Sequence, residues 1–336
     1  MSRRDIETLS AALPTLTRRM GERGLRALSE SVARMVSPLS AQQQRLLSIV
    51  DEEREGILYQ HSVLCQTCLP YRNPGEGHRR WTRKNGYLTL ELDAGRAFDQ
   101  ELSGFVDVGL PFGPKPRLVL YHLNAEALRT QSPVIELADT LTAFVKRTLG
   151  LDAHGRNIQT VREQLTRLAA SDFRIGKSEN GHAITVHGRI LDGLKLWTAP
   201  PTAKRALWPS AVQFSSEYFD SLLTHAVPLN EAAVGHLAHS AMALDIYTWL
   251  AQRLHRIEPG KTTLVTWASL CEQFGPSYAH VREFRRVFKH TLKQVKVVYP
   301  DAIFDLTVLG MHLKHSRPPV PRRLLPVGGV LVDKPA

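Results

Sequence analysis

The clearest hydrophobic pattern in the chain lies in residues 278–299. Apolar residues recur there at spacings of three and four, which predicts a helix with one buried face. These residues are Val281, Phe284, Phe288, Leu292, Val295 and Tyr299. Six basic residues form a second stripe along the adjacent flank: Arg282, Arg285, Arg286, Lys289, Lys293 and Lys296. Glu283 is the single acid in this stretch, and it projects away from the basic flank.

A flank of one charge sign is unusual on a helix that merely faces solvent. Like charges repel along a helix, so a solvated face usually alternates its signs. A helix that buries one face and offers cations on the next suits the phosphate wall of a DNA groove. The alternative is a lysine-rich solvated helix.

The region before residue 200 alternates helical and extended patterns. A buried helix is expected at 117–129 and a short strand at 134–137, and Asp139 is a candidate cap for the next helix. A further helix has an apolar face of Ile158, Val161, Leu165 and Leu168, with Gln159, Arg162 and Thr166 on a neighbouring face. Alternating residues on both sides of Asn180-Gly181 then predict a hairpin, and Asp192-Gly193 predicts a second turn.

The second half repeats this order of elements. A long helix is expected at 231–256, a β-branched strand at 262–267 and a short helix at 268–274. Gly275-Pro276 forms the turn, Ser277 is the candidate cap of the basic helix, and Pro300 ends that helix. Residues 303–313 read as strands, with a phase change near Gly310.

Both halves therefore read as a helix-turn-helix followed by a β-hairpin wing. The expected fold class is mainly α with small β-hairpins (α+β), arranged as two tandem winged-helix domains at 51–200 and 201–321. Residues 1–50 are polar and are expected to be partly helical or disordered, and residues 322–336 to be a flexible tail. The most basic helix falls in the recognition position of the second helix-turn-helix.

The composition agrees with an acidic partner. The 336 residues carry a formal net charge of +11, which suits nucleic acid or an anionic membrane surface. The membrane option is weak because no run of about 18 apolar residues occurs and the first residues lack the apolar core of a signal peptide. We therefore expect a cytoplasmic protein without a membrane partner. The three cysteines do not form a disulfide framework.

Several segments resemble the RepA-type plasmid replication initiator proteins. They are 65–72 (CQTCLPYR), 109–118 (GLPFGPKPRL), 123–127 (LNAEA), 284–288 (FRRVF), 298–300 (VYP) and 316–321 (SRPPVP). The resemblance covers roughly residues 57–321, and its most specific parts are the LPFGPKPRL run and the PPVP end. Phe112 stands where many relatives have Tyr.

This resemblance implies a sequence-specific DNA-binding protein of a plasmid or related replicon. Related initiators bind repeated origin sites through tandem winged helices, help to open an AT-rich stretch, and recruit the host replication initiator and helicase. Many also repress their own promoter as homodimers. The expected partners are therefore double-stranded DNA, those two host proteins and a second copy of the chain.

The candidate site residues all serve DNA contact. In the second half they are Ser277, Tyr278, His280, Arg282, Arg285, Arg286, Lys289, Lys293 and Lys296, with the first three placed for base edges. In the first half they are Gln159, Arg162 and Thr166, with Lys177 and the Asn180-Gly181 wing tip reaching backbone or minor groove. We expect no catalytic residue, no cofactor and no metal.

Other chemistries fit the sequence less well. Cys65 and Cys68 with His61 and His78 allow a zinc site to be drawn, but the spacing fits no common finger, and two buried or half-buried thiols are favoured. The Gly-Lys-Ser and Gly-Lys-Thr triplets at 176–178 and 260–262 lack the glycine that a phosphate-binding loop requires five positions earlier.

Two further functions and one segment stay open. A promoter regulator without initiator activity would use the same DNA-binding residues. A rolling-circle nicking enzyme would need a metal-binding histidine pair and a nucleophilic tyrosine, and the pairs His236/His239 and His312/His315 fit this poorly. The basic segment 79–84 suits either a phosphate contact or a solvated loop.

Overall fold

The structure is a computed structural model that describes residues 56–75, 77–99, 102–137, 140–179, 182–196, 209–275 and 278–320. All of them belong to one compact unit, residues 53–336. The sequence predictions for residues 1–50 and 322–336, the Asp139 cap and the Asn180-Gly181 turn lie outside the described residues. The described part mixes helices with small sheets, so the predicted α+β class is confirmed.

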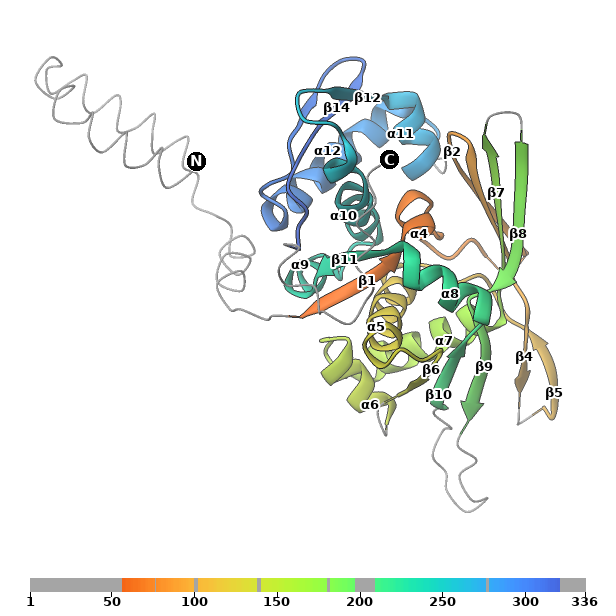
Figure 1. The fold of residues 1–336 in the computed structure, drawn as a ribbon. Helices are drawn as coiled ribbons and strands as arrows, with labels where there is room; N and C mark the ends of the chain where they lie inside the picture. Colours follow the sequence, from red (N-terminus) through yellow and green to blue (C-terminus); the bar gives the residue numbers. More distant parts are fainter. Residues whose placement is uncertain are drawn as a thin grey trace, which may run out of the picture. The chain divides into compact units, whose positions relative to one another are not determined.

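Two buried helices form the centre of the described unit (Figure 1). Helix α5 (Pro114–Thr130) is the predicted buried helix, and every residue of α10 (Ala241–Arg253) except Arg253 is buried. Strand β1 (Ile57–His61) packs on α5 and pairs antiparallel with β11 (Ala226–Asn230). This pairing joins the first and last thirds of the chain.

The predicted hairpin near residue 180 belongs to a larger sheet. Strands β7 (Asp172–Glu179) and β8 (His182–Arg189) pair as expected, and β7 also pairs with β3 (Leu88–Asp93), which pairs with β2 (Arg80–Asn85). The alternation along β3 places Leu88, Leu90 and Leu92 in the core. The hairpin predicted as the wing of the first half is therefore one half of a four-stranded sheet.

A three-stranded sheet corrects the predicted turn at Asp192-Gly193. Both residues lie inside β9 (Leu191–Leu196), and the register with β10 (Pro209–Phe214) shifts between Gly193 and Leu191. Asp192 is thus the extra residue of a β-bulge, a position that turn-forming residue types also favour. On its other edge β10 pairs with the predicted short strand, β6 (Val134–Glu136).

The remaining elements before β11 connect these sheets. They are α4 (Ser62–Gln66), β4 (Arg96–Asp99), β5 (Gly104–Asp107), α6 (Leu141–Ala143), the π-helical turn η1 (Phe144–Thr148), α7 (Gly155–Ala170) and α8 (Ser216–His225). Thr140 caps α6 by accepting a hydrogen bond from the Ala143 amide. The apolar face predicted for α7 is confirmed, because Val161, Leu165 and Leu168 are buried.

The prediction of one long helix at 231–256 is wrong. The segment forms α9 (Glu231–Leu237), then α10, and ends in the 3₁₀ turn η2 (Leu254–Arg256). Ser240 starts α10 by accepting a hydrogen bond from the Ala243 amide at 3.2 Å. Since residues on both sides of the break are mostly alanine and other apolar types, the pattern carries no periodic signal that would locate it.

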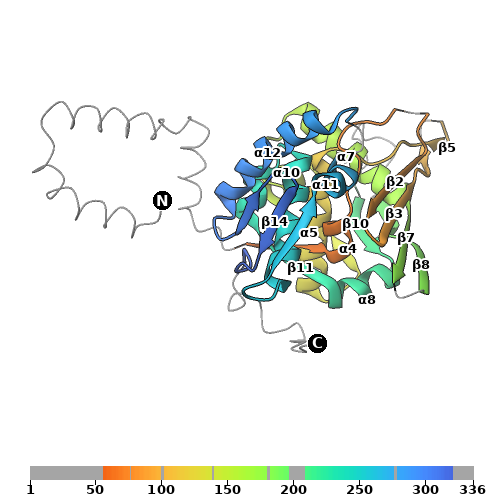
Figure 2. The ribbon, with the colours of Figure 1, turned by 90° about the horizontal axis from the view of Figure 1, so that it is seen from above.

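The final elements follow the predicted order. Strand β12 (Thr262–Thr266) leads into α11 (Trp267–Phe274), and α12 (Val281–Val298) is the basic helix. Strands β13 (Phe304–Leu306) and β14 (Gly310–Lys314) then form a hairpin, with β14 in the middle of the sheet β12-β14-β13. Figure 2 shows α12 beside α10 and the end of this sheet near α11.

The division into domains at about residue 200 stays a prediction. Two strand pairings cross that position, β1 with β11 and β10 with β9. A buried ion pair crosses it as well. The Arg117 guanidinium donates to both carboxylate oxygens of Asp245 at 2.7 Å, and to the carbonyls of Gly113 at 2.6 Å and Leu69 at 2.8 Å.

Asp245→Asn should destabilise the chain strongly. The substitution leaves the Arg117 guanidinium buried beside a neutral amide, and removing one partner of a buried pair costs about 3–5 kcal/mol. Urea unfolding followed by circular dichroism measures the change. Glu258→Gln is the matched control, because Glu258 pairs with Lys261 in solvent and its loss should cost less than about 1 kcal/mol. Equal effects of the two substitutions would contradict the role given to the buried pair.

Candidate nucleic-acid interface

Helix α12 is anchored by aromatic side chains. Phe284 and Phe288 are fully buried, with ring centroids 5.3 Å apart, and Phe288 also contacts Phe274 of α11 at 5.6 Å. Gly275, between the two helices, permits this approach, because a Cβ atom there would lie 2.2 Å from the Phe284 ring. The turn between α11 and α12 therefore holds the basic helix closely against the core.

The basic flank of α12 is exposed. At 100° per residue its six cations fall within an arc of about 100°, centred roughly a quarter-turn or more from the buried face. Arg282, Arg286, Lys289 and Lys293 are exposed, and none of them pairs with a carboxylate in the described part of the chain. Their charges are therefore available to an anionic partner.

Two cations of the flank are oriented by a tryptophan. The guanidinium carbon of Arg285 lies 4.7 Å from the ring centroid of Trp267, and the ammonium of Lys289 lies 5.6 Å from it. Trp267 is buried and is the first residue of α11. These cation–π contacts restrict two long side chains to the side of α12 that faces the β12-β14-β13 sheet.

The helix begins later than the sequence suggests. Its N-cap is His280, with no side-chain cap hydrogen bond, whereas Ser277 lies outside the described residues. Tyr278 precedes the helix and packs edge-on against Phe284 at 5.8 Å. Burial raises the pKa of the Tyr278 phenol, while the guanidinium of Arg72 acts in the opposite direction. Arg72 thus adds an exposed cation near the start of α12.

Lys296 is engaged at the other end of the helix. Its ammonium donates to the Pro300 carbonyl at 2.8 Å and to the Ala302 carbonyl, and it lies 5.6 Å from the ring of Phe304. A cation at this place offsets the negative end of the helix dipole. Lys296 therefore has a structural role that the basic stripe in the sequence does not reveal.

The first-half candidates occupy α7 and the adjoining strand. Gln159 is exposed, and the Thr166 hydroxyl donates to the Arg162 carbonyl at 3.1 Å. Arg162 is half-buried. Lys177 lies on β7 opposite Leu88, and its side chain is outside the described residues. Thus α7 presents one polar face, with fewer free cations than α12.

Comparisons with known proteins now add the family. Residues 110–269 match the model of the family described as plasmid encoded RepA protein. Residues 110–269 are thus similar to the RepA replication initiators of plasmids. Two solved structures of RctB domains 2 and 3 also match: one, a SeMet derivative, has a TM-score of 0.48 and 12% identity, and the match covers 69% of this chain and 83% of that chain. A second has a TM-score of 0.44, 14% identity and coverages of 69% and 82%. No curated protein sequence matches the chain.

The match agrees with the resemblance seen in the sequence and supports a role in replication initiation. The matched range contains the LPFGPKPRL run, which forms the start of α5 and supplies Arg117 to the buried ion pair. It ends within α11, so it stops before the basic helix. Among the residues that the structure describes, no helix is long and apolar enough to cross a membrane.

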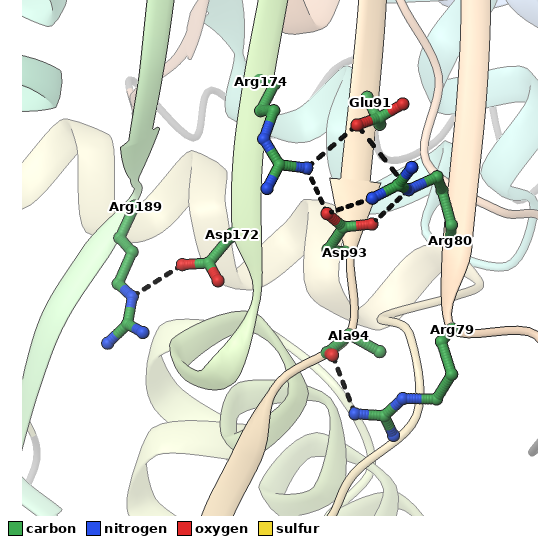
Figure 3. Close-up of polar contacts among 8 residues, drawn as sticks. All are labelled: Arg79, Arg80, Glu91, Asp93, Ala94, Asp172, Arg174 and Arg189. Carbon is green, nitrogen blue, oxygen red and sulfur yellow. Dashed lines mark hydrogen bonds and ion pairs between the residues drawn. The ribbon is translucent and has the colours of Figure 1, made fainter.

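The basic segment 79–84 is mostly paired within the chain (Figure 3). Arg80 donates to the Asp93 carboxylate at 2.7 Å, and Arg174 pairs with Glu91 at 2.9 Å and with Asp93. Arg79 donates to the Ala94 carbonyl at 2.8 Å. Residues 80–85 form β2, so this part of the segment is not a loop. Lys84 is exposed, and a phosphate contact by the segment stays a prediction.

The thiols of the Cys-x-x-Cys pair are buried, as favoured from sequence. Cys65 and Cys68 are 2% and 1% exposed, whereas Cys271 is partly exposed. Burial raises the pKa of both buried thiols, and the nearby Asp245 carboxylate raises them further. No group of three or more potential metal-binding side chains occurs among the described residues.

Lys296→Met should lower the stability of the chain by roughly 1 kcal/mol, since the variant keeps the side-chain length and loses the hydrogen bonds to two carbonyls. Lys293→Met removes the same charge from the same helix at an unpaired position and should change stability by less than about 0.5 kcal/mol. Urea unfolding compares the two variants. The structural role of Lys296 is wrong if their stabilities are equal.

Native thiol titration should distinguish the cysteines. At mildly alkaline pH an aromatic disulfide reagent should modify Cys271 first, because burial and a raised pKa keep the Cys65 and Cys68 thiols protonated and shielded. The other two should react only when denaturant is added. A Cys271→Ser variant serves as the control and should show no fast phase. Fast reaction of two thiols in that variant would disprove the buried assignment.

Proposed function

We propose that the chain initiates replication by binding repeated origin DNA through α12, without catalytic chemistry of its own. The observation that carries this proposal is the row of exposed cations on α12 that have no carboxylate partner in the described residues of a RepA-type chain. Such a row concentrates positive potential on one side of the helix, and the DNA backbone is a matching anion.

The order of the elements around α12 supports the proposal that this region is a winged helix. Strand β12, helices α11 and α12, and the β13–β14 hairpin follow one another in the order of a winged helix, with α12 in the recognition position. In the first half α7 and the β7–β8 hairpin follow the same order, although β7 also pairs with β3. We take the tandem arrangement as part of the proposal.

Residues along α12 are proposed to contact different parts of the DNA. In the proposed complex, the start of the helix enters a major groove, where Ser277, Tyr278 and His280 lie near base edges. The exposed cations Arg282, Arg286, Lys289 and Lys293 bind phosphate or base edges, and Arg285 is held toward the wing by Trp267. Arg72 adds a phosphate contact near the helix start. Lys296 contributes little to binding, because its ammonium is engaged.

The first half is proposed to take a weaker share of the DNA. Gln159, Arg162 and Thr166 of α7 and Lys177 of β7 are the contacts there. Two linked reading helices in one chain favour direct repeats, whereas a dimeric repressor favours a palindrome. Binding of the host initiator, the host helicase and a second copy of the chain completes the proposal.

Binding of the full chain to duplex DNA should depend steeply on salt. If about seven phosphates are neutralised, log affinity against log salt falls with a slope near −6. Arg286→Ala/Lys293→Ala should flatten the slope by about 2, since each removes one phosphate contact. Arg129→Ala/Lys261→Ala removes the same charge from α5 and the start of β12, where both cations are already paired with acids, and should leave the slope unchanged. Fluorescence anisotropy gives the slopes, and a slope near zero for the native chain would refute the proposal.

A footprint on DNA flanking the chain's own gene tests the initiator role. We expect evenly spaced protections beside an AT-rich tract, lost in Arg286→Ala/Lys293→Ala and retained in Arg129→Ala/Lys261→Ala. One palindromic protection over the promoter would instead indicate a regulator without initiator activity. Uniform, salt-sensitive coating would show a general nucleic-acid surface and not a sequence-specific one.

A further inference from the structure

The turn between β13 and β14 exposes two branched aliphatic side chains. Val308 is 82% exposed, the highest value among large apolar residues in the described part of the chain, and Leu309 beside it is 64% exposed. Leu306, at the end of β13, is 38% exposed. An exposed turn in solvent usually carries polar residues, so this tip is an apolar patch at an unusual place.

Hydrogen bonds hold the backbone of this turn in place. Trp267 donates from its indole nitrogen to the Thr307 carbonyl at 3.0 Å and from its amide to the Leu309 carbonyl at 3.1 Å. The Thr307 amide donates to the Gly310 carbonyl at 2.9 Å, and Arg285 reaches the Val308 carbonyl at 3.5 Å. With its carbonyls turned to α11 and α12, the turn presents Val308 and Leu309 outward in a fixed geometry.

Gly310 is required for the close approach of the turn to its neighbour. A Cβ atom at this position would lie 2.1 Å from the Val265 carbonyl oxygen of β12. The tip is therefore attached to the same framework that carries α12, and not to an independent loop. Ordered apolar side chains bind at a lower entropic cost than mobile ones.

The charged side chains near Val308 and Leu309 indicate which kind of partner this tip binds. Arg285, on the basic flank of α12, donates to the Val308 carbonyl of the tip. Lys289, on the same flank, lies over the indole ring of Trp267. The nearby Asp305 carboxylate is paired with Lys314 at 2.7 Å. A partner that meets both the apolar tip and these cations is anionic and offers an apolar surface. A DNA duplex does so, because phosphates line the groove and stacked bases lie within it.

We propose that Val308 and Leu309 insert as a wedge into the minor groove beside the major groove that α12 occupies, and partly unstack one base step. This inference rests on the proposed DNA-binding function. Apolar wedges of this kind act best at flexible pyrimidine–purine steps, and they bend the duplex. In this proposal the β13–β14 hairpin does more than contact the DNA backbone, because it weakens base stacking next to the bound site.

The test uses the full chain and a duplex selected by it from a random pool, labelled with 2-aminopurine at successive positions. Fluorescence of 2-aminopurine rises when its base is unstacked. The native chain should raise the fluorescence at one step flanking the protected site. Val308→Ser/Leu309→Ser should abolish this rise while affinity changes by less than about tenfold, because phosphate contacts supply most of the binding.

Two further variants separate the possible explanations. Leu102→Ser removes an aliphatic side chain of similar exposure, 71%, outside the proposed interface, and should behave as the native chain. Val308→Lys/Leu309→Lys adds two cations at the tip and should maintain or raise affinity, yet still fail to unstack the step. Thermal unfolding of each variant confirms that the fold is kept.

The possible results separate failure of the wedge from failure of the proposed DNA binding. If the native chain selects no duplex, the proposed DNA binding fails first. If it binds without a local fluorescence rise, or if the serine and lysine variants unstack the step as the native chain does, the wedge is overturned and DNA binding stands. Loss of self-association in the serine variant with unchanged DNA fluorescence would assign the tip to a protein contact and also overturn the wedge.

Discussion

The buried ion pair of Arg117 and Asp245 is the interaction on which the described fold most depends. Arg117 is near the start of α5, and Asp245 lies in α10, so one guanidinium joins the two central helices. The same guanidinium also donates to the carbonyls of Leu69 and Gly113. A buried cation with this many partners fixes the position of every group it bonds, because leaving any one unpaired would be costly.

Periodic patterns predicted the elements that bury one face. Helices α7 and α12 show their buried residues at helical spacing, and the β7–β8 hairpin was placed by its alternation around a turn pair. Elements without such contrast were missed. The break between α9 and α10 falls in an apolar stretch, and Asp192 suits a bulge as well as a turn. Pairings between distant strands, such as β1 with β11, leave no local trace in the sequence.

At the candidate site, too, the sequence predicts some residue roles and not others. The basic stripe of α12 was visible because cation spacing follows the helix, and most of its members are exposed as expected. The sequence did not reveal that Lys296 donates to backbone carbonyls or that Arg285 lies over Trp267. Both contacts form only when the chain has folded. The sequence did not point to Arg72, because it lies about two hundred positions from α12. It also did not show that Arg80 pairs with Asp93, because this acid is on the neighbouring strand.

On α12, anchoring and exposed functions belong to different side chains. The phenylalanines that fix the helix face Gly275 and the core, where a larger residue or a smaller ring would shift the helix. Arg282, Arg286 and Lys293 project from another flank and take no part in this packing. As a result, substitutions at these three positions carry almost no folding penalty. Descendants of this chain can therefore diverge in the anionic surface they prefer while inheriting an unchanged scaffold.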